Sequence, residues 1–159
     1  MTTDYQTDAA SEVARWWTVA TTEGLFARPR QDGATFTCTW TAADRITFQI
    51  AFRLGKKIRR IRGTLVEDPR AEGGYPWRYT RRGIALGGRV GLSRTADESL
   101  LAIHLPPTMI SNGGCILLAR SDVDHAAAPD RISRALAELN LTRAEYQRLL
   151  WRTPVADAA

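Results

Sequence analysis

Side chains that could carry acid–base or electrophilic chemistry are few and scattered in this 159-residue sequence. Tyr79 and the indole N–H of Trp77 could each donate a hydrogen bond that polarises a substrate carbonyl. Glu23 could act as an acid or base if it were partly desolvated, and His104 is the fourth catalytic candidate. The sequence contains no Gly-x-Ser-x-Gly elbow, no P-loop and no dinucleotide-binding fingerprint. These residues therefore do not identify a catalytic constellation.

The residues that commonly bind metals are equally sparse. Cys38 and Cys115 are the two cysteines, and His104 and His125 the two histidines, and no spacing among them is typical of zinc or haem ligands. We expect two reduced, buried thiols, with a single disulfide between them as the alternative. We therefore expect neither a metal nor a cofactor.

The net charge is +5, and much of the excess lies between Lys56 and Arg62 and in three arginines between positions 78 and 82. We interpret the first cluster as the solvated face of a hairpin, because Ile58 and Ile61 interrupt the charges and no nucleic-acid motif accompanies them. The alternatives are a phosphate-binding patch for nucleic acid or anionic lipid, and the entrance for an anionic small molecule. We expect no nucleic-acid partner.

The length fits one domain, and we assign residues 13–159 to it, with residues 1–12 as a flexible N-terminus or a lid. No run of apolar residues is long enough to span a membrane. The first residues include acidic side chains and lack the apolar core of a signal peptide. We expect a cytoplasmic protein without a membrane span, and the oligomeric state is left open.

The middle of the chain alternates apolar and polar residues, which is typical of β-strands with one buried face. In the stretch TFTCTWT, Phe36, Cys38 and Trp40 share one face and the threonines share the other. Eight sequential strands close naturally into an antiparallel up-and-down barrel, which can hold one small ligand. We predict this all-β fold, with strands at 16–24, 35–41, 46–53, 58–68, 75–83, 87–95, 99–106 and 113–120.

The pattern then changes to helical spacing. Ile132, Ala135 and Leu139 recur on one face of a segment at about 129–140, so we predict an amphipathic helix packed on the outside of the barrel. Thr142 and Glu145 have the spacing of a capping box, which predicts a shorter helical or extended tail after it.

Strand alternation also predicts which side chains line the interior. We prefer Trp77 and Tyr79 as ligand contacts, because each combines a flat apolar face with one hydrogen-bonding group. His104 alternates with Ile103 and Leu105, so its imidazole is expected to face outward. Any inward residue could equally be plain core at a closed end. The predicted ligand-binding set is Phe36, Trp40, Phe48, Ile50, Phe52, Leu65, Trp77, Tyr79, Leu92, Ile103 and Leu105.

Several landmarks resemble the lipocalin family, and in particular its bacterial, apolipoprotein-D-like branch. In ARWWTVATTEGLFARP, Trp16 matches the tryptophan of the family's glycine-any-tryptophan motif, although Ala14 replaces the glycine. RGTLVED resembles a later strand, and Arg120 takes the place of the arginine that follows the last barrel strand. The resemblance covers roughly residues 11–153. Ser121-Asp122 replaces the usual threonine-proline, which is typical of a divergent member.

The resemblance implies a role for Arg120. In lipocalins the matching arginine crosses the closed end of the barrel and packs over the first-strand tryptophan, which is Trp16 here. A guanidinium stacked on an indole gains about 0.5–2 kcal/mol. Trp16 and Arg120 are therefore expected to close one end of the barrel, which leaves the opposite end for a ligand.

The resemblance also implies a hydrophobic ligand, and two functions remain open. The interior could preorganise a flexible polyene or polyketide intermediate, as in cofactor-independent cyclases or isomerases of natural-product pathways, where preorganisation lowers barriers by up to ~7–11 kcal/mol. Alternatively, the barrel could be a non-catalytic carrier of a lipid-like ligand. The Ala- and Arg-rich composition favours a bacterial source.

Overall fold

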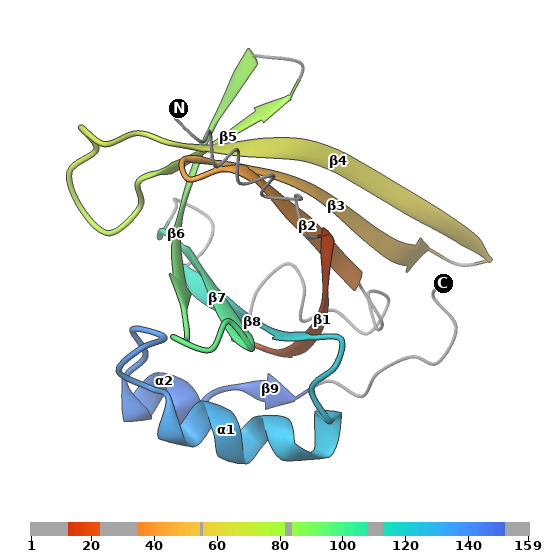
Figure 1. Cartoon of the computed structure of the whole chain (residues 1–159), viewed down its shortest axis with the longest axis vertical. Coiled ribbons are helices and arrows are strands. Elements are labelled where there is room, and N and C mark those ends of the chain that lie inside the picture. The colour runs from red at the N-terminus through yellow and green to blue at the C-terminus, as the bar shows by residue number, and fades with distance from the viewer. Residues whose placement is uncertain (1–12, 23–34, 55, 82–83, 108–112, 152–159) are drawn as a thin grey trace, which may run out of the picture.

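A computed structural model describes residues 13–22, 35–54, 56–81, 84–107 and 113–151 (Figure 1). The strands are β1 (Val13–Thr21), β2 (Thr35–Ala42), β3 (Arg45–Leu54), β4 (Lys57–Glu67), β5 (Trp77–Arg81), β6 (Ile84–Arg94), β7 (Leu100–Leu105), β8 (Gly114–Arg120) and β9 (Leu150–Trp151). Each of the eight predicted strands is present within a few residues of its expected bounds. Residues 1–12, which we assigned to a flexible N-terminus or a lid, lie outside the described residues.

The strands form one antiparallel up-and-down sheet that closes on itself. Its order is β2-β3-β4-β5-β6-β7-β8-β1-β9, and β1 also pairs with β2, which joins the two ends. The predicted barrel is therefore confirmed. The β1–β2 pairing ends at Trp17 and Thr35, and β9 pairs with Ala20 and Thr21 further along the same edge of β1. β9 is an addition that strand alternation alone does not predict, because two residues are too few to show a period.

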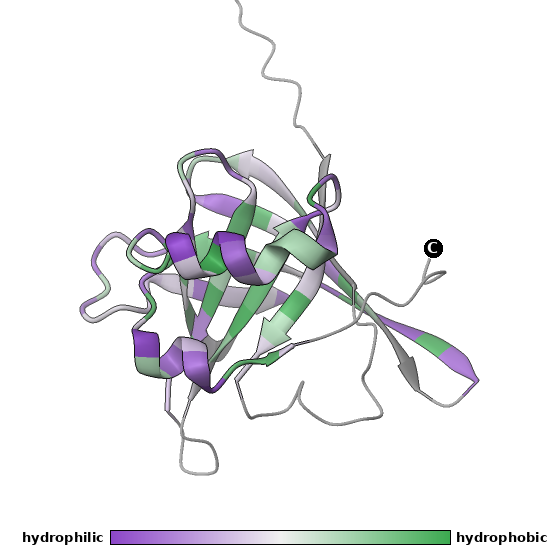
Figure 2. Ribbon diagram, turned by 90° about the horizontal axis from the view of Figure 1, so that it is seen from below, coloured by the Kyte–Doolittle hydropathy of each residue, from purple (hydrophilic) through white to green (hydrophobic). Residues whose placement is uncertain are grey.

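Apolar side chains separate into two clusters on opposite faces of the barrel wall. The first contains residues from all eight barrel strands and none from the helices, so it fills the interior. The second joins the outer faces of β1, β7 and β8 to the helical segment. Figure 2 views the molecule from this helical side and shows apolar strands behind helices that carry polar bands.

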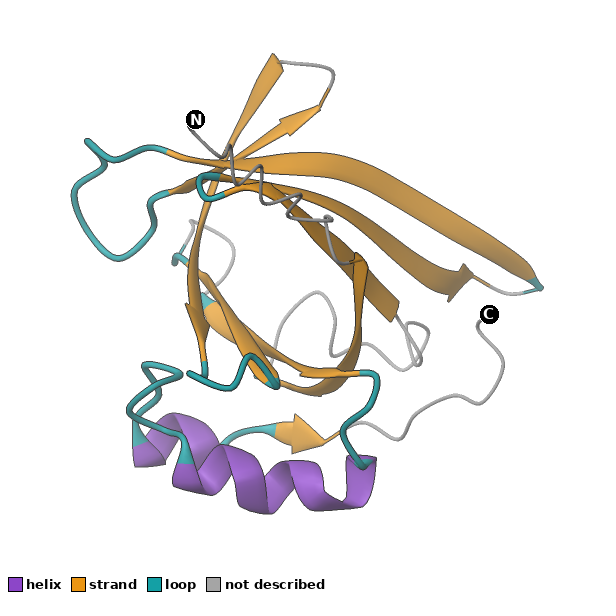
Figure 3. Cartoon of the chain, viewed as in Figure 1, coloured by secondary structure: helices purple, strands orange, loops and turns teal. Residues whose placement is uncertain are grey.

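The helical segment lies against the outside of the barrel, as Figure 3 shows, and its apolar residues belong to the second cluster. A 3-10 helix, η3 (His125–Ala127), leads into α1 (Ala128–Arg134), which is shorter than the helix predicted at about 129–140. The chain continues in hydrogen-bonded turns, in which Leu141 N–H donates to Leu136 C=O at 2.8 Å and Asn140 has a φ of 52°. Asparagine tolerates this left-handed conformation, which ends the helical path. Ile132, Ala135 and Leu139 are buried, as their spacing predicts.

A second helix, α2 (Arg143–Gln147), begins at the predicted capping box. The Thr142 side chain accepts a hydrogen bond from Glu145 N–H, and the Glu145 carboxylate accepts one from Thr142 N–H at 2.7 Å. No helix in the described ranges is long and apolar enough to cross a membrane. Cys38 and Cys115 are both free and buried, one in the interior cluster and the other in the outer cluster.

The β3–β4 hairpin extends beyond the barrel wall (Figure 1). β2 pairs with β3 only as far as Ala51, and β5 pairs with β4 only between Thr64 and Glu67. Among the described strands, residues 52–54 therefore pair only with residues 57–59, and residues 60–62 continue this ribbon to the barrel wall, opposite residues 49–51 of β3. We call residues 52–54 and 56–62 the β3–β4 arm.

Candidate functional site in the barrel interior

The interior is lined by the aromatic and aliphatic side chains that strand alternation predicts. Nine of the eleven predicted lining residues belong to the interior cluster or pack against it, and the side chains of Phe36 and Phe52 lie outside the described residues. The nine are Trp40, Phe48, Ile50, Leu65, Trp77, Tyr79, Leu92, Ile103 and Leu105. The alternation places them inside because each shares a face with inward neighbours two residues away.

Burial changes along the interior. At the end where β1 begins and β8 ends, Trp16 is 3% exposed, Leu101 3% and Leu118 1%. We call this end the floor. At the opposite end, the inward-facing Ile50 and Ile116 are only partly buried. The floor is therefore closed around Trp16, Leu101 and Leu118, whereas Ile50 and Ile116 at the other end are more accessible.

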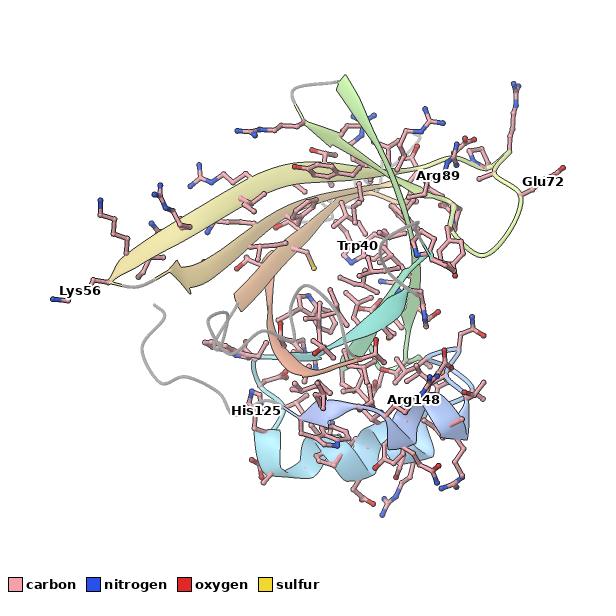
Figure 4. The ribbon with its side chains drawn as sticks, turned by 180° about the vertical axis from the view of Figure 1, so that it is seen from behind. Trp40, Lys56, Glu72, Arg89, His125 and Arg148 are labelled. Carbon is pink, nitrogen blue, oxygen red and sulfur yellow. The ribbon has the colours of Figure 1, made fainter. Side chains whose placement is uncertain are left out.

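The floor contains an aromatic pair covered by an arginine. The Trp40 and Trp77 rings meet edge to face, with centroids 5.5 Å apart and planes at 84°. The Arg94 guanidinium lies over the Trp40 ring, 4.6 Å from its centroid, and its Nη1 is 3.2 Å from Glu98 Oε1. This geometry is that of a cation–π contact. Figure 4 shows Trp40 on the inner side of the barrel wall.

Arg94 is not among the residues predicted to close the barrel. Its signal in the sequence is its position at the end of a strand, which is also the position of Arg120. Alternation alone does not show that its guanidinium reaches the Trp40 ring, because that contact joins β6 to β2 across the barrel.

Arg120 lies directly opposite Trp16 in the β1–β8 pairing, so the two residues share a face of the sheet at the floor. Its guanidinium donates to both carboxylate oxygens of Asp122, at 2.7 and 3.0 Å, and Nη1 donates to the Glu98 carbonyl at 3.4 Å. The β1–β8 register therefore places Arg120 next to Trp16, the two residues predicted to close the barrel. Stacking of the guanidinium on the Trp16 indole stays a prediction.

Gly63 makes room for the ring of Tyr79. Phe48 and Tyr79 have ring centroids 5.5 Å apart with planes inclined at 41°. A Cβ added at Gly63 would collide with the Tyr79 ring and lie 3.0 Å from Phe48 Cζ. A glycine within a strand often marks such a close approach, and this was the available signal in the sequence. Gly63 thus sets the position of the aromatic side chain that we prefer as a ligand contact.

Two buried polar groups lie on the inner face without a hydrogen-bond partner among the described residues. These groups are the Trp16 indole N–H and the Thr21 hydroxyl, and both residues are at most 3% exposed. Thr21 is on the inner face because it lies opposite Ile116, which packs against the interior cluster. Ligand pockets are mostly apolar, with a few polar groups that orient the ligand, and the interior has this composition.

The catalytic candidates do not converge. Trp77 and Tyr79 are in the interior, whereas Glu23 lies outside the described residues. His104 faces outward as predicted, and its Nε2 is 2.9 Å from the carbonyl oxygen of Leu139 in the helical segment. His104 therefore holds the helical segment against the barrel and does not line the interior.

Cys38 is the interior thiol. Burial raises the pKa of its thiol to about 12. Because the thiolate is the nucleophilic form, this cysteine behaves as an apolar side chain near neutral pH.

No protein-family model matches the sequence, and no curated protein matches it. Solved structures do match the fold. H1 crustacyanin from the lobster Homarus americanus has a TM-score of 0.60 and 12% sequence identity over 95% of this chain and 82% of that chain. Lobster apocrustacyanin A1 has a TM-score of 0.60 and 10% identity over 89% and 77%. The siderocalin Ex-FABP has a TM-score of 0.59 and 16% identity over 92% and 95%.

These neighbours are lipocalins, and at this level of identity the likeness concerns the fold. The alignments cover most of each chain, so the similarity extends over the whole barrel and is not confined to a shared hairpin. The resemblance to lipocalins, inferred from Trp16, Arg120 and the strand order, is thereby confirmed at the level of the fold. This chain has the lipocalin fold.

Proposed function

We propose that the barrel binds a hydrophobic small molecule in its interior and admits it through the end opposite the floor. The gradient of burial carries this proposal. Trp16, Leu101 and Leu118 at the floor are almost inaccessible, whereas Ile50 and Ile116 at the opposite end face inward but are only partly buried. An eight-stranded barrel has room for one small ligand, and an apolar lining with a few polar groups suits a hydrophobic one.

The structural neighbours support a binding role. The siderocalin Ex-FABP is reported to function through dual ligand specificities, and the similarity to this chain covers 95% of it. The two sequences share 16% identity, so we do not transfer the ligands of Ex-FABP to the present chain.

A carrier is the simpler function for this interior, and a cofactor-independent cyclase or isomerase is the alternative. Of the four catalytic candidates, Trp77 and Tyr79 lie where they could contact a ligand, and both can donate a hydrogen bond. The catalytic candidates do not converge, so the described interior favours binding over acid–base chemistry.

A filling substitution tests the proposed site. Ile50→Trp adds bulk to the accessible end of the interior, and we expect the affinity for the hydrophobic fluorophore 1-anilinonaphthalene-8-sulfonate (ANS) to fall at least tenfold. Thr47→Trp is the matched control, because Thr47 is exposed on the outer face of the same strand. ANS titration of both variants, with melting temperatures measured in parallel, decides the matter. Equal affinity in the two variants would show that the fluorophore binds elsewhere.

Mass spectrometry of the molecule that copurifies with the full chain separates the two functions. A carrier releases its ligand with unchanged structure after repeated binding cycles. Conversion of a linear polyene or polyketide into an isomer of equal mass would establish the cyclase instead.

A further inference from the structure

The β3–β4 arm places its tip away from the rest of the molecule. In Figure 4, Lys56 lies at the far end of this ribbon, on the opposite side of the barrel from Arg148 in the helical segment. Every described side chain from Lys56 to Arg62 is exposed. A flat surface can therefore approach the arm without meeting the helices.

The arm also accounts for the net positive charge of the chain. Residues 52–62 contain six lysines and arginines and no aspartate or glutamate. The complete sequence has 22 basic and 17 acidic residues, so the remainder has 16 basic and 17 acidic residues and a net charge of −1. The field of the protein is thus concentrated on one projecting ribbon, and an anionic partner would be steered to it.

Two large apolar side chains are exposed among these charges. Ile58 is 40% exposed and Ile61 is 44% exposed. Ile61 lies opposite Ile50 in the β3–β4 register, whereas Ile58 lies opposite Arg53, so the two isoleucines occupy opposite faces of the ribbon. Each face of the arm therefore combines an isoleucine with cationic residues.

Protection of an unpaired strand edge explains only part of this composition. Charged residues, lysine above all, keep exposed edges from pairing with other chains. Charges of either sign serve that purpose, and exposed isoleucines oppose it. The single sign of the charges and the presence of both isoleucines therefore call for a second explanation.

We propose that the β3–β4 arm docks the protein on an anionic phospholipid bilayer. The lysines and arginines would contact lipid phosphates, and Ile58 and Ile61 would enter the boundary between headgroups and acyl chains. This combination of basic and apolar side chains is the one that binds membrane interfaces. A nucleic acid would satisfy the charges, but its phosphodiester backbone offers no apolar surface to the isoleucines.

Vesicle flotation with the full chain tests the docking. Vesicles of phosphatidylcholine and phosphatidylglycerol at 7:3 are compared with phosphatidylcholine alone, each at 50 and 300 mM NaCl. We expect binding to the anionic vesicles, weaker binding at the higher salt because the charges are screened, and no binding to neutral vesicles. Equal binding to both vesicle types would overturn the proposal.

Charge variants locate the contact. The triple substitution Lys56→Gln, Lys57→Gln and Arg60→Gln should weaken binding to anionic vesicles roughly 100-fold, since each basic residue near the surface contributes about fivefold.

The matched control removes the same charge from the other side of the molecule, by Arg131→Gln, Arg143→Gln and Arg148→Gln, which are all exposed. The control should lose far less affinity. Equal losses in the two triple variants would show that net charge alone is responsible, and the arm would then have no special role.

Apolar variants separate a bilayer from a nucleic acid. Ile58→Thr with Ile61→Thr keeps β-branched side chains and the charge, and it should weaken vesicle binding at least tenfold without changing anisotropy measured with a duplex DNA oligonucleotide. Unchanged vesicle binding, or duplex DNA binding tighter than vesicle binding at equal salt, would identify a general polyanion site and overturn the proposal.

A fluorescent label reports insertion directly. Ile58→Cys labelled with an NBD maleimide should show a blue shift on anionic vesicles. The native Cys38 and Cys115 are buried and have thiol pKa values raised to about 12, so the label goes to position 58. An unshifted spectrum on bound vesicles would contradict insertion. ANS affinity is measured on the same arm variants. Weaker vesicle binding at unchanged ANS affinity separates membrane docking from ligand binding in the interior.

Discussion

Replacement of Gly63 by alanine is the sharpest test of how the interior is packed. The added methyl group would collide with the Tyr79 ring and press on Phe48, so one ring has to move. Both rings are part of the interior lining: Phe48 belongs to the buried cluster, and Tyr79 packs against it. The substitution changes no charge and no hydrogen bond, so its effect reports packing alone.

The expected loss of stability follows from two opposing contributions. Overpacking by one methyl group costs about 1–3 kcal/mol. The smaller conformational entropy of alanine in the unfolded chain offsets about 0.4–1 kcal/mol of this. We therefore expect the free energy of unfolding to fall by about 1–2 kcal/mol, which corresponds to a melting temperature lower by roughly 2–8 °C for a chain of this size.

Gly88→Ala is the control, because a Cβ at this strand glycine would meet nothing within 4 Å. It should leave stability unchanged or raise it by a few tenths of a kcal/mol. Urea unfolding is measured for both variants, for Tyr79→Ala and for Gly63→Ala combined with Tyr79→Ala; the wild type, the two single variants at positions 63 and 79 and the double variant form a double-mutant cycle. If the Gly63 substitution costs as much without the Tyr79 ring as with it, or no more than the Gly88 substitution, the packing argument is wrong.

Two further predictions concern the floor. Arg120→Ala removes the bidentate contact with Asp122 and the predicted stacking on Trp16, so it should lower the melting temperature while leaving ANS affinity unchanged. Loss of ANS binding at an unchanged melting temperature would contradict a purely structural role. Hydrogen bonds from Thr95 and Ser99 lower the pKa of Asp97 to about 2, below its ordinary value of 3.8. Its stabilising effect is therefore complete above about pH 4 and is lost as the pH falls toward 2. Asp97→Asn should flatten the wild-type pH dependence of unfolding in this window, and superimposable curves would refute the assignment.

Local patterns predicted most of the secondary structure. A strand's alternation depends on its own residues, so Phe48, Ile50 and their neighbours could be assigned to one face without knowledge of the partners. The capping box at Thr142 is equally local, because its donor and acceptor are three residues apart. Eight strands in sequence then leave few topologies besides a closed barrel.

The length of α1 shows the limit of such patterns. Ile132, Ala135 and Leu139 are buried as their spacing requires, yet the regular helix ends at Arg134. Turns bring Leu139 to the same apolar surface and leave its carbonyl within 2.9 Å of His104 Nε2. Periodicity reports which face is buried, but it does not distinguish a helix from a succession of turns with a similar period.

The sequence by itself determined the fold class, the inward face of each strand and the resemblance carried by Trp16 and Arg120. Tertiary structure alone decided that Arg94 covers Trp40, that Gly63 accommodates Tyr79 and that the β3–β4 arm extends past its neighbouring strands. The physical reason is the range of the interactions. Alternation and capping act within a few residues, whereas the closed floor, the accessible end and the projecting charge arise from pairing between distant strands and from where that pairing stops.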